Sequence, residues 1–252
     1  TLTPASSGTG TGVNITASAI TGINGGVGWL ATDVGRIISF NSGKAKITAR
    51  TNTTVVVVTI TTAFANTDAT VAFQLGAFSD TTGHPSCVSF FEQRLVFAGT
   101  TDEPQTLYFS KSGDYENMTT GTNADDAMVY TIASNQVNKI RYLKSVRTLL
   151  IGTTGGEFSV SADGTDAAVT PVNITIKRQS SFGAANVDAQ PAGNAVLFLQ
   201  RAKRKIRELA YNFDADGYVA PDLTILNETV TNSGINEMAY QQAPDSILWC
   251  VR

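Results

Sequence analysis

The feature that most constrains the fold is a short pattern that returns at intervals of about fifty residues. The segment "RLVFAGTT" occupies positions 94–101, and "RTLLIGTT" occupies positions 147–154. Both contain an arginine, an apolar run and Gly-Thr-Thr, at an offset of 53 positions. Two further apolar runs, "NAVLFLQ" and "SILWCV", begin at positions 194 and 246. A repeat of this length is typical of stacked structural units.

Each apolar run lies in a context that predicts a small antiparallel sheet. Each run is preceded by a segment that we expect to form an outer strand, namely "VSFF", "KIRYL", "NVDAQ" and "NEMAY" in chain order. The first three runs are followed by a turn and a further expected strand, namely "TLYFS", "EFSV" and "KIRELAY". In the first repeat we expect strands at 87–91, 95–98 and 106–110. A sheet with two apolar faces buries both only between neighbouring sheets, and its central strand is then continuously apolar. The glycine after the run would allow a sharp turn.

This repeat predicts a β-propeller portion over residues 78–252, with about three blades and part of a fourth. Such a portion does not close a ring, so we expect either further blades beyond Arg252 or an open array. One stretch, "APDLTILNETVTNSG" at 220–234, has the pattern of a short helix that Asp222 or Thr224 would cap.

Residues 1–77 have the pattern of a separate small β domain, sandwich-like or barrel-like. The segment "DVGRIISFNSGKAKITAR" predicts strands at 36–40 and 44–48, joined by a hairpin turn at Asn41-Ser42-Gly43. The β-branched run "TTVVVVTITT" predicts another strand. We expect "INGGVGWLATDVG" to be a loop and "SDTTGHP", at 79–85, to be a linker. The predicted fold class is therefore all-β, with a small N-terminal domain followed by an incomplete propeller.

Several motifs together resemble a known family. They include Gly83, Pro85, Gln93-Arg94-Leu95, Ala98-Gly99-Thr100, Ser110, Gly113-Asp114-Tyr115 and Asn117. The segments "DDAMVYTIASNQVNKIRYL", "RELAYNFDADGYVAPDLT", "MAYQQAPDSILWCV" and "TDVGRIISFNSGKAKIT" extend the resemblance over nearly the whole chain. In these motifs the chain resembles the tail tubular protein B, or tail nozzle, family of short-tailed phages and related prophage proteins.

The resemblance implies a structural protein of the virion tail that is assembled in the cytoplasm of the host bacterium. Six nozzle subunits form a ring below the portal and adaptor, continue the DNA channel, and take part in genome retention and ejection. It also implies adaptor and tail fibre proteins as partners, with DNA passing through the channel in weak, non-specific contact at most.

Composition and charge argue against a nucleic-acid binder, a disulfide-rich or zinc-binding protein, and a membrane-spanning protein. The net charge is -3 and the chain has two cysteines, Cys87 and Cys250. A dedicated nucleic-acid binder is usually basic, and two cysteines make neither a disulfide framework nor a four-ligand zinc site. We expect both to be buried free thiols. No apolar run reaches the roughly 18 residues of a membrane span, and the N-terminus lacks a signal-peptide pattern.

The sequence contains no convincing set of catalytic residues, so we expect a protein that is not an enzyme. A nucleophilic triad would need the single histidine, His84, which we expect in a turn, with Cys87 pointing into a sheet. The segment "NFDADG" at 212–217 resembles the start of a calcium loop, but Leu223 stands where the bidentate glutamate is required, so a hairpin turn is the simpler interpretation.

Paired carboxylates for glycoside hydrolysis could come from Asp125, Asp126, Asp163 and Asp166, but nothing in the sequence fixes their separation. The glycine-rich "GTGTG" and "TTGGE" lack the lysine of a phosphate-binding loop and are interpreted as turns. No cofactor or metal is expected.

The strongest candidate for a contact site is "RAKRKIR", which contains Arg201, Lys203, Arg204, Lys205 and Arg207. These residues could contact an acidic neighbouring subunit or DNA phosphates, or form a solvated hairpin turn.

The primary hypothesis is a nozzle or hub ring subunit, which predicts a homo-hexamer. The alternative is a propeller that recognises a surface glycan or protein, which predicts a monomer with an aromatic-lined pocket. A glycosidase, with two carboxylates across a cleft, ranks third.

Overall fold

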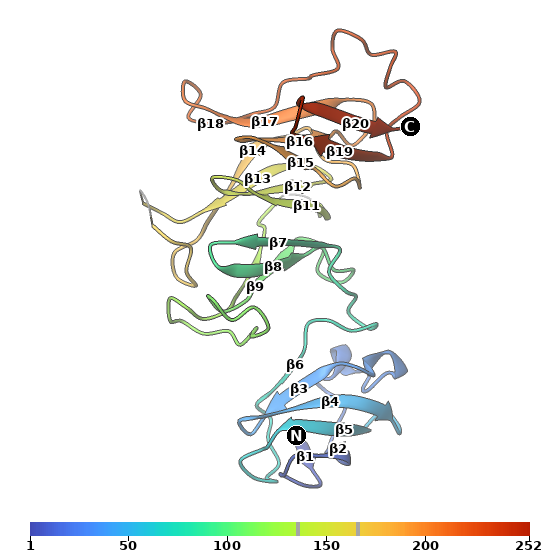
Figure 1. Ribbon diagram of the computed structural model, residues 1–252. Helices are drawn as coiled ribbons and strands as arrows, with labels where there is room; N and C mark the ends of the chain where they lie inside the picture. The colour runs from blue at the N-terminus through green and yellow to red at the C-terminus, as the bar shows by residue number, and fades with distance from the viewer. Residues whose placement is uncertain (135–136, 165–166) are drawn as a thin grey trace. The chain divides into compact units, whose positions relative to one another are not determined.

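The computed structural model describes residues 1–134, 137–164 and 167–252, which form two compact units, Thr1–His84 and Pro85–Arg252 (Figure 1). Strand accounts for 46% of the structure and helix for 2%, so the all-β prediction is confirmed. The division follows His84, whereas the predicted boundary followed residue 77. Most of the predicted linker therefore belongs to the first unit.

The first unit is built on one curled six-stranded sheet. Its strands follow the order β1-β2-β5-β4-β3-β6 and are antiparallel wherever they pair. Two short 3-10 turns, η1 (Asn24–Gly26) and η2 (Ala31–Asp33), lie in the segment that was predicted to be a loop. The strands are β1 (Leu2–Pro4), β2 (Gly10–Ala17), β3 (Ile37–Phe40), β4 (Gly43–Arg50), β5 (Val55–Thr62) and β6 (Phe73–Leu75).

The hairpin between β3 and β4 follows directly from its turn residues. Phe40 pairs with Gly43, so Asn41 and Ser42 form a two-residue turn. Their φ angles are 44° and 61°, and a turn with two left-handed residues matches the twist of the flanking strands. A Cβ atom on Gly43 would overlap the Phe64 ring, which explains glycine at the start of β4.

The core of the first unit is built by residues that alternate along its strands. Val56, Val58 and Ile60 of β5 are buried, while the residues between them are partly exposed. Period-two burial of this kind is expected of a sheet with one face on the core. Trp29, from the segment before β3, is fully buried in the same core.

The second unit contains three four-stranded antiparallel meanders and a two-stranded sheet (Figure 1). We refer to them as blades 1 to 4. Blade 1 contains β7 (Cys87–Phe91), β8 (Arg94–Ala98), β9 (Thr106–Phe109) and β10 (Met128–Thr131). Blade 2 contains β11 (Ile140–Ser145), β12 (Leu149–Thr153), β13 (Gly156–Ser161) and β14 (Thr175–Ser180). Blade 3 contains β15 (Gln190–Ala192), β16 (Ala195–Leu199), β17 (Ile206–Asn212) and β18 (Gly217–Val219). Blade 4 contains β19 (Glu237–Gln241) and β20 (Ile247–Val251).

Successive blades are joined by apolar cores. Val96 and Phe109 of blade 1 share a core with residues of blade 2, and Leu150 of blade 2 shares another with residues of blade 3. A third core joins Leu199 of blade 3 to Met238 of blade 4. The second and third blades therefore bury both faces, as the propeller interpretation requires.

Residues at the same position of the repeated sequence motif do not occupy the same position in the structures of blades 1 and 2, because β12 is shifted by one residue relative to β8. Val96 and Leu149 occupy the same motif position, yet both lie in the core between these two blades. Leu150, not Leu149, contacts the core toward blade 3. A one-residue slip turns every side chain of a strand to the opposite face. Arg94 and Arg147 are therefore not equivalent: Arg94 begins β8, and Arg147 lies in the turn before β12.

The two motif glycines are also needed for different reasons. Gly99 follows β8 and has a φ of 75°, as predicted for a residue at a sharp turn. Gly152 lies inside β12, where an added Cβ atom would overlap the ring of Tyr142. Its role is close packing rather than a turn.

Two local predictions were wrong. The segment at 186–190 was expected to be a strand, but β15 comprises only Gln190–Ala192. The predicted helix at 220–234 consists of turns. There, Asp222 Oδ1 accepts hydrogen bonds from the Thr224 amide and hydroxyl, and such local side-chain bonds compete with helix formation.

Candidate functional site

The basic segment singled out in the sequence forms the connection between β16 and β17. The turn is closed by hydrogen bonds from the Gln200 amide to the Lys205 carbonyl, at 2.8 Å, and from the Lys203 amide to the Gln200 carbonyl, at 2.7 Å. Lys203 has a left-handed φ of 61°. The structure brings the five predicted side chains to one place on blade 3 but divides them into two groups.

Lys205 and Arg207 make contacts within the chain itself. Lys205 Nζ lies 2.9 Å from Asp222 Oδ2 and 3.1 Å from Glu228 Oε1, and these bonds raise the pKa of Lys205. Burial acts to raise the pKa of Asp222, but hydrogen bonds from Thr224 and Lys205 outweigh it and lower that pKa to about 2. The ion pairs fasten the segment after β18 to the basic turn.

Arg207 makes a second internal attachment. Its Nε donates to Gln200 Oε1 at 2.9 Å, and its Nη1 donates to the Ala220 carbonyl at 2.6 Å. The guanidinium carbon lies 3.5 Å from the centre of the Phe182 ring, in a cation–π contact. Lys205 and Arg207 are thus engaged in contacts that a DNA phosphate or a partner would have to replace.

Arg201, Lys203 and Arg204 form the second, exposed group. Arg201 donates to the Thr154 carbonyl at 3.4 Å, Lys203 donates to Asn236 Oδ1 at 3.3 Å, and Arg204 donates to Asn232. All these acceptors are neutral, and none of the three cations has a carboxylate partner among the ion pairs of the described residues. Their charges are available to a partner.

Next to these cations, the segment between β18 and β19 exposes four aliphatic side chains. Leu226 is 96% exposed and Ile225 is 67% exposed, with Val230 at 57% and Leu223 at 47%. The charged group of Arg252 donates to the Val230 carbonyl at 3.1 Å. This exposed apolar loop was not identified from the sequence, which predicted a short helix over the same residues.

The remaining catalytic candidates are not brought together. His84 Nε2 lies 3.1 Å from Asp80 Oδ1 in an exposed pair, whereas Cys87 is buried against blade 2. Burial raises the pKa of the Cys87 thiol, which disfavours the reactive thiolate. Cys250 is exposed, so the prediction of two buried thiols is wrong for this residue, which lies on β20 of blade 4.

The segment "NFDADG" forms the hairpin between β17 and β18, as predicted. Asn212 Oδ1 accepts a hydrogen bond from the Ala215 amide, and the Tyr211 hydroxyl donates to Asp216 Oδ1 at 2.8 Å. Asp216 has a left-handed φ of 43°. Within the described ranges, no group of three His, Cys, Asp or Glu side chains is arranged to hold a metal ion.

The proposed carboxylate pairs have other partners. Lys111 Nζ lies 3.4 Å from Asp125 and 3.0 Å from Asp126, both in the connection from β9 to β10. Asp163 belongs to the loop after β13, where its amide donates to Asn173 Oδ1. Asp166 lies outside the described residues. Of the glycine-rich segments, "TTGGE" makes the turn from β12 to β13, whereas Gly10 and Gly12 lie in β2.

A buried arginine organises the connection from β9 to β10. Arg94 is 2% exposed, and its guanidinium donates to the carbonyls of Ser110, Asp126 and Ala124 at 2.8, 2.7 and 2.5 Å. Burial lowers the pKa of Arg94, because the charged form loses its water. The side chain fixes the start and the end of a long surface loop.

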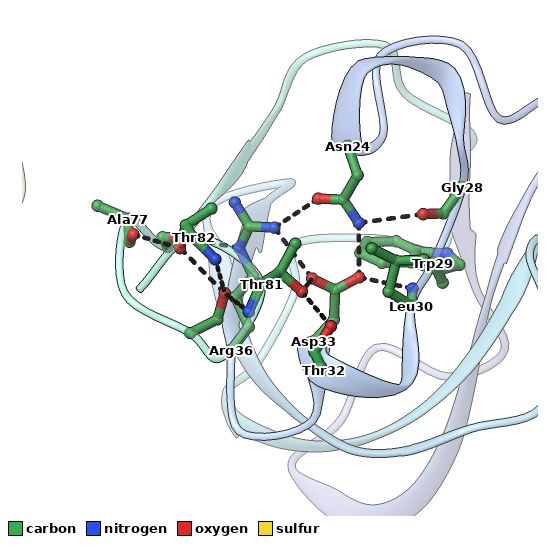
Figure 2. Close-up of polar contacts among 12 residues, drawn as sticks. Asn24, Gly28, Trp29, Leu30, Thr32, Asp33, Arg36, Ala77, Thr81 and Thr82 are labelled. Atoms are coloured by element: carbon green, nitrogen blue, oxygen red, sulfur yellow. Dashed lines mark hydrogen bonds and ion pairs between the residues drawn. The ribbon is translucent and has the colours of Figure 1, made fainter. Parts of the chain in front are cut away.

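A polar cluster missed by the sequence analysis organises the first unit (Figure 2). Asp33 is fully buried and accepts four hydrogen bonds. The donors are Asn24 Nδ2 at 2.6 Å, the Leu30 amide at 2.8 Å, Arg36 Nη1 at 3.1 Å and Thr81 Oγ1 at 2.8 Å. The only sequence signal was an Asp-x-x-Arg spacing, which is common in exposed turns.

The same cluster secures the predicted linker. Arg36 Nε donates to the Gly76 carbonyl at 2.7 Å, and Thr82 Oγ1 donates to the Ala77 carbonyl at 2.6 Å. Together with the bond from Thr81 to Asp33, these contacts fold residues 76–82 onto the first unit (Figure 2). This explains why the unit extends to His84.

A buried carboxyl lies where the chain passes from blade 2 to blade 3. Glu157 is fully buried, and its Oε2 accepts a hydrogen bond from Ser180. Burial raises the pKa of Glu157, while the Ser180 hydroxyl and the amides of Phe182 and Gly183 oppose that rise. Its Oε1 has no hydrogen-bond partner among the described residues.

Comparison with known proteins adds little about function. No protein-family model matches the chain, and no curated protein matches it. Among solved structures, it is similar to the crystal structure of an auxiliary nutrient binding protein from Bacteroides thetaiotaomicron, with a TM-score of 0.37 and 10% sequence identity. That alignment covers 99% of this chain, which spans 64% of the other protein. A likeness at this level gives no information on function. Among the described residues no helix is long and apolar enough to cross a membrane.

Proposed function

We propose that this protein is a structural subunit of a tail nozzle or hub ring of a short-tailed phage or related prophage. In this role it would extend the DNA channel below the portal and adaptor and take part in genome retention and ejection. The proposal includes assembly as a homo-hexamer in the bacterial cytoplasm, contact with adaptor and tail fibre proteins in the virion, and no catalytic activity.

The observation that supports the proposal most directly concerns the motif residues of blade 1. The Gly113 amide donates to the Gln93 carbonyl at 2.8 Å, and the Leu95 amide donates to Ser110 Oγ at 2.9 Å. Arg94 binds the Ser110 carbonyl at 2.8 Å. Five of the residues that carry the family resemblance thus form one connected framework, which is what shared structural motifs, rather than shared chemistry, would produce.

Negative-stain electron microscopy of the purified protein tests the proposal. We expect class averages of a six-fold ring with a central channel. Particles that remain single at concentrations of about 10 µM, together with binding to a glycan or cell-surface protein, would instead favour the alternative of a binding module.

One observation favours that alternative. A pocket of about 400 Å³ lies between β10 and β14, lined by residues that include Tyr130, Phe158, Ile176 and Arg178. Two aromatic rings beside a cation could bind a sugar or a peptide side chain. Screening against a glycan array, with Tyr130→Ala as the comparison because Tyr130 is only partly buried, would test this second function.

A further inference from the structure

Two exposed surfaces of the second unit have matching chemistry. The first, which we call the aliphatic surface, contains Leu223, Ile225, Leu226 and Val230 with the cations Arg201, Lys203, Arg204 and Arg252. The second, which we call the aromatic surface, contains Val88, Phe90 and Tyr115 with the acids Asp114 and Glu116. Each combines apolar side chains with a net charge, which is positive on the aliphatic surface and negative on the aromatic surface.

The aromatic surface is formed by β7 and the loop after β9. Phe90 and Tyr115 contact each other edge to face, with ring centres 5.2 Å apart. Phe90 is 61% exposed and Val88 is 59% exposed, so most of this apolar area faces solvent. Asp114 and Glu116 flank Tyr115 and are exposed.

Internal bonds preorganise both surfaces. Arg94 holds the two ends of the loop that contains Tyr115, and Lys205 holds the aliphatic loop through Asp222 and Glu228. A loop that is fixed before binding loses less conformational entropy when a partner docks. Lys205 compensates one of the two negative charges of Asp222 and Glu228, and the four exposed cations leave the aliphatic surface with a net positive charge.

The two surfaces cannot satisfy each other within one chain. The aromatic surface lies on blade 1, at the end where the first and second strands are joined. The aliphatic surface lies on blades 3 and 4, at the end of blade 3 where the second and third strands are joined. Blade 2 separates them, because it packs against blade 1 on one face and blade 3 on the other.

We propose that the aromatic surface of one copy of this chain binds the aliphatic surface of a second copy. The contact joins different patches, so it is heterologous, and its repetition generates a ring when the rotation between neighbouring subunits closes. Charge complementarity would orient the encounter, and the apolar side chains would supply the buried area. The inference rests on the proposed ring assembly, for which it specifies the subunit contact.

Charge reversal provides the test. Variant A carries Asp114→Lys and Glu116→Lys, and variant B carries Arg201→Glu and Lys203→Glu. The mass of each protein is measured by light scattering against concentration up to about 100 µM, where contacts of micromolar affinity are populated. We expect the wild-type protein to associate, and each variant to require at least about tenfold higher concentration.

Mixing the two variants distinguishes this contact from a general charge effect. In an equimolar mixture, the aromatic surface of variant B meets the aliphatic surface of variant A with both charge sets native. The aromatic surface of variant A meets the aliphatic surface of variant B with both charge sets reversed. Both contacts are complementary, so association should return to within about threefold of wild type. Asp68→Lys with Asp214→Lys matches the charge change of variant A at exposed positions outside both surfaces, and Lys46→Glu with Lys177→Glu matches variant B. Neither control should change association.

A further pair of variants tests the apolar contribution. Leu226→Asp and Phe90→Asp should each weaken association at least about tenfold, whereas Val172→Asp, at a valine whose exposure lies between those of Leu226 and Phe90, should not. Circular dichroism melting curves, unchanged from wild type, show that each variant is folded.

The outcomes separate the inference from the proposed function. If six-fold rings form but the reversals leave association unchanged, the proposed contact is wrong and the ring function stands. If the wild-type protein is monomeric over the whole concentration range, both fail for this chain. Loss in each single variant and recovery in the mixture support both.

Discussion

Replacing Arg94 by methionine should destabilise the second unit while leaving the first unchanged. Methionine preserves much of the apolar stem but removes donors to three carbonyls, at 2.8, 2.7 and 2.5 Å. A hydrogen bond to a charged group contributes about 1.5–3 kcal/mol, and the bonds of one group are not additive. Ser110 is buried, whereas Ala124 is exposed and Asp126 is half-buried, so water can replace part of the lost bonding, and we expect a loss of about 2–3 kcal/mol.

Urea unfolding would measure this loss, and two probes separate the units. The chain's other tryptophan, Trp249, lies in the second unit, so the measurement is made in a Trp249→Phe background. There the emission of the fully buried Trp29 follows the first unit, while near-ultraviolet circular dichroism includes the second. Only the transition of the second unit should move. Hydrogen exchange should also lose protection over residues 110–127, whose two ends Arg94 joins.

Arg178 provides a matched control. It donates to the Ser180 and Gly155 carbonyls at 3.1 and 2.9 Å, but its side chain is exposed, so water can replace it at both acceptors. Arg178→Met should therefore cause no resolvable change in unfolding. If Arg94→Met is also within about 1 kcal/mol of wild type, the buried guanidinium does not hold this loop, and the reasoning fails.

Three further predictions concern other parts of the structure. Asp33→Asn should destabilise the first unit by about 3 kcal/mol, because an amide cannot accept from all four donors; unchanged unfolding by Trp29 emission would contradict it. Gly152→Ala should cost about 3 kcal/mol, because its methyl group would overlap the Tyr142 ring, whereas Gly10→Ala, with open space around the added atom, should be tolerated in the same urea assay. Burial raises the pKa of Glu157 in the folded protein above its ordinary value of 4.5. The wild-type protein should therefore lose stability as the pH rises from that ordinary pKa through the higher pKa of the folded state, and Glu157→Gln should remove this loss. Melting temperatures of both proteins between about pH 4 and pH 7 would show a growing advantage for the glutamine variant, and a constant difference would refute the assignment.

The elements that could be predicted from sequence are those whose cause is local. The turn at Asn41 and Ser42 follows from the left-handed tolerance of its residues and from the strands on either side. The strands of blades 1 and 2 follow from apolar runs bounded by glycine and polar residues. In both cases the determining neighbours are within a few positions.

The features that were missed depend on residues distant in the chain. Nothing near Gly152 indicates that the Tyr142 ring occupies the space of its Cβ atom. The one-residue slip between the first two blades is hidden because Val96 and Leu149 are both apolar and both buried, whichever face they occupy. A repeated motif establishes the number of blades more securely than the orientation of their side chains.

The candidate site was found in part for the same reason. Clustered charges at 201–207 are visible in the sequence, but their partners are not. Only the structure shows that Lys205 is neutralised by Asp222 and Glu228, while Arg201 and Lys203 meet neutral oxygens. The aliphatic loop was missed because the sequence predicted a short helix there, and local hydrogen bonds of Asp222 compete with that helix.

The mass of the assembled particle tests the central claim most directly. Native mass spectrometry of the purified protein at low ionic strength should give a species of six times the 26.6 kDa subunit mass. That species should dissociate as salt screens the charged contact. A single species at the subunit mass, at every concentration and salt tested, would contradict the account of this chain as a ring-forming structural subunit.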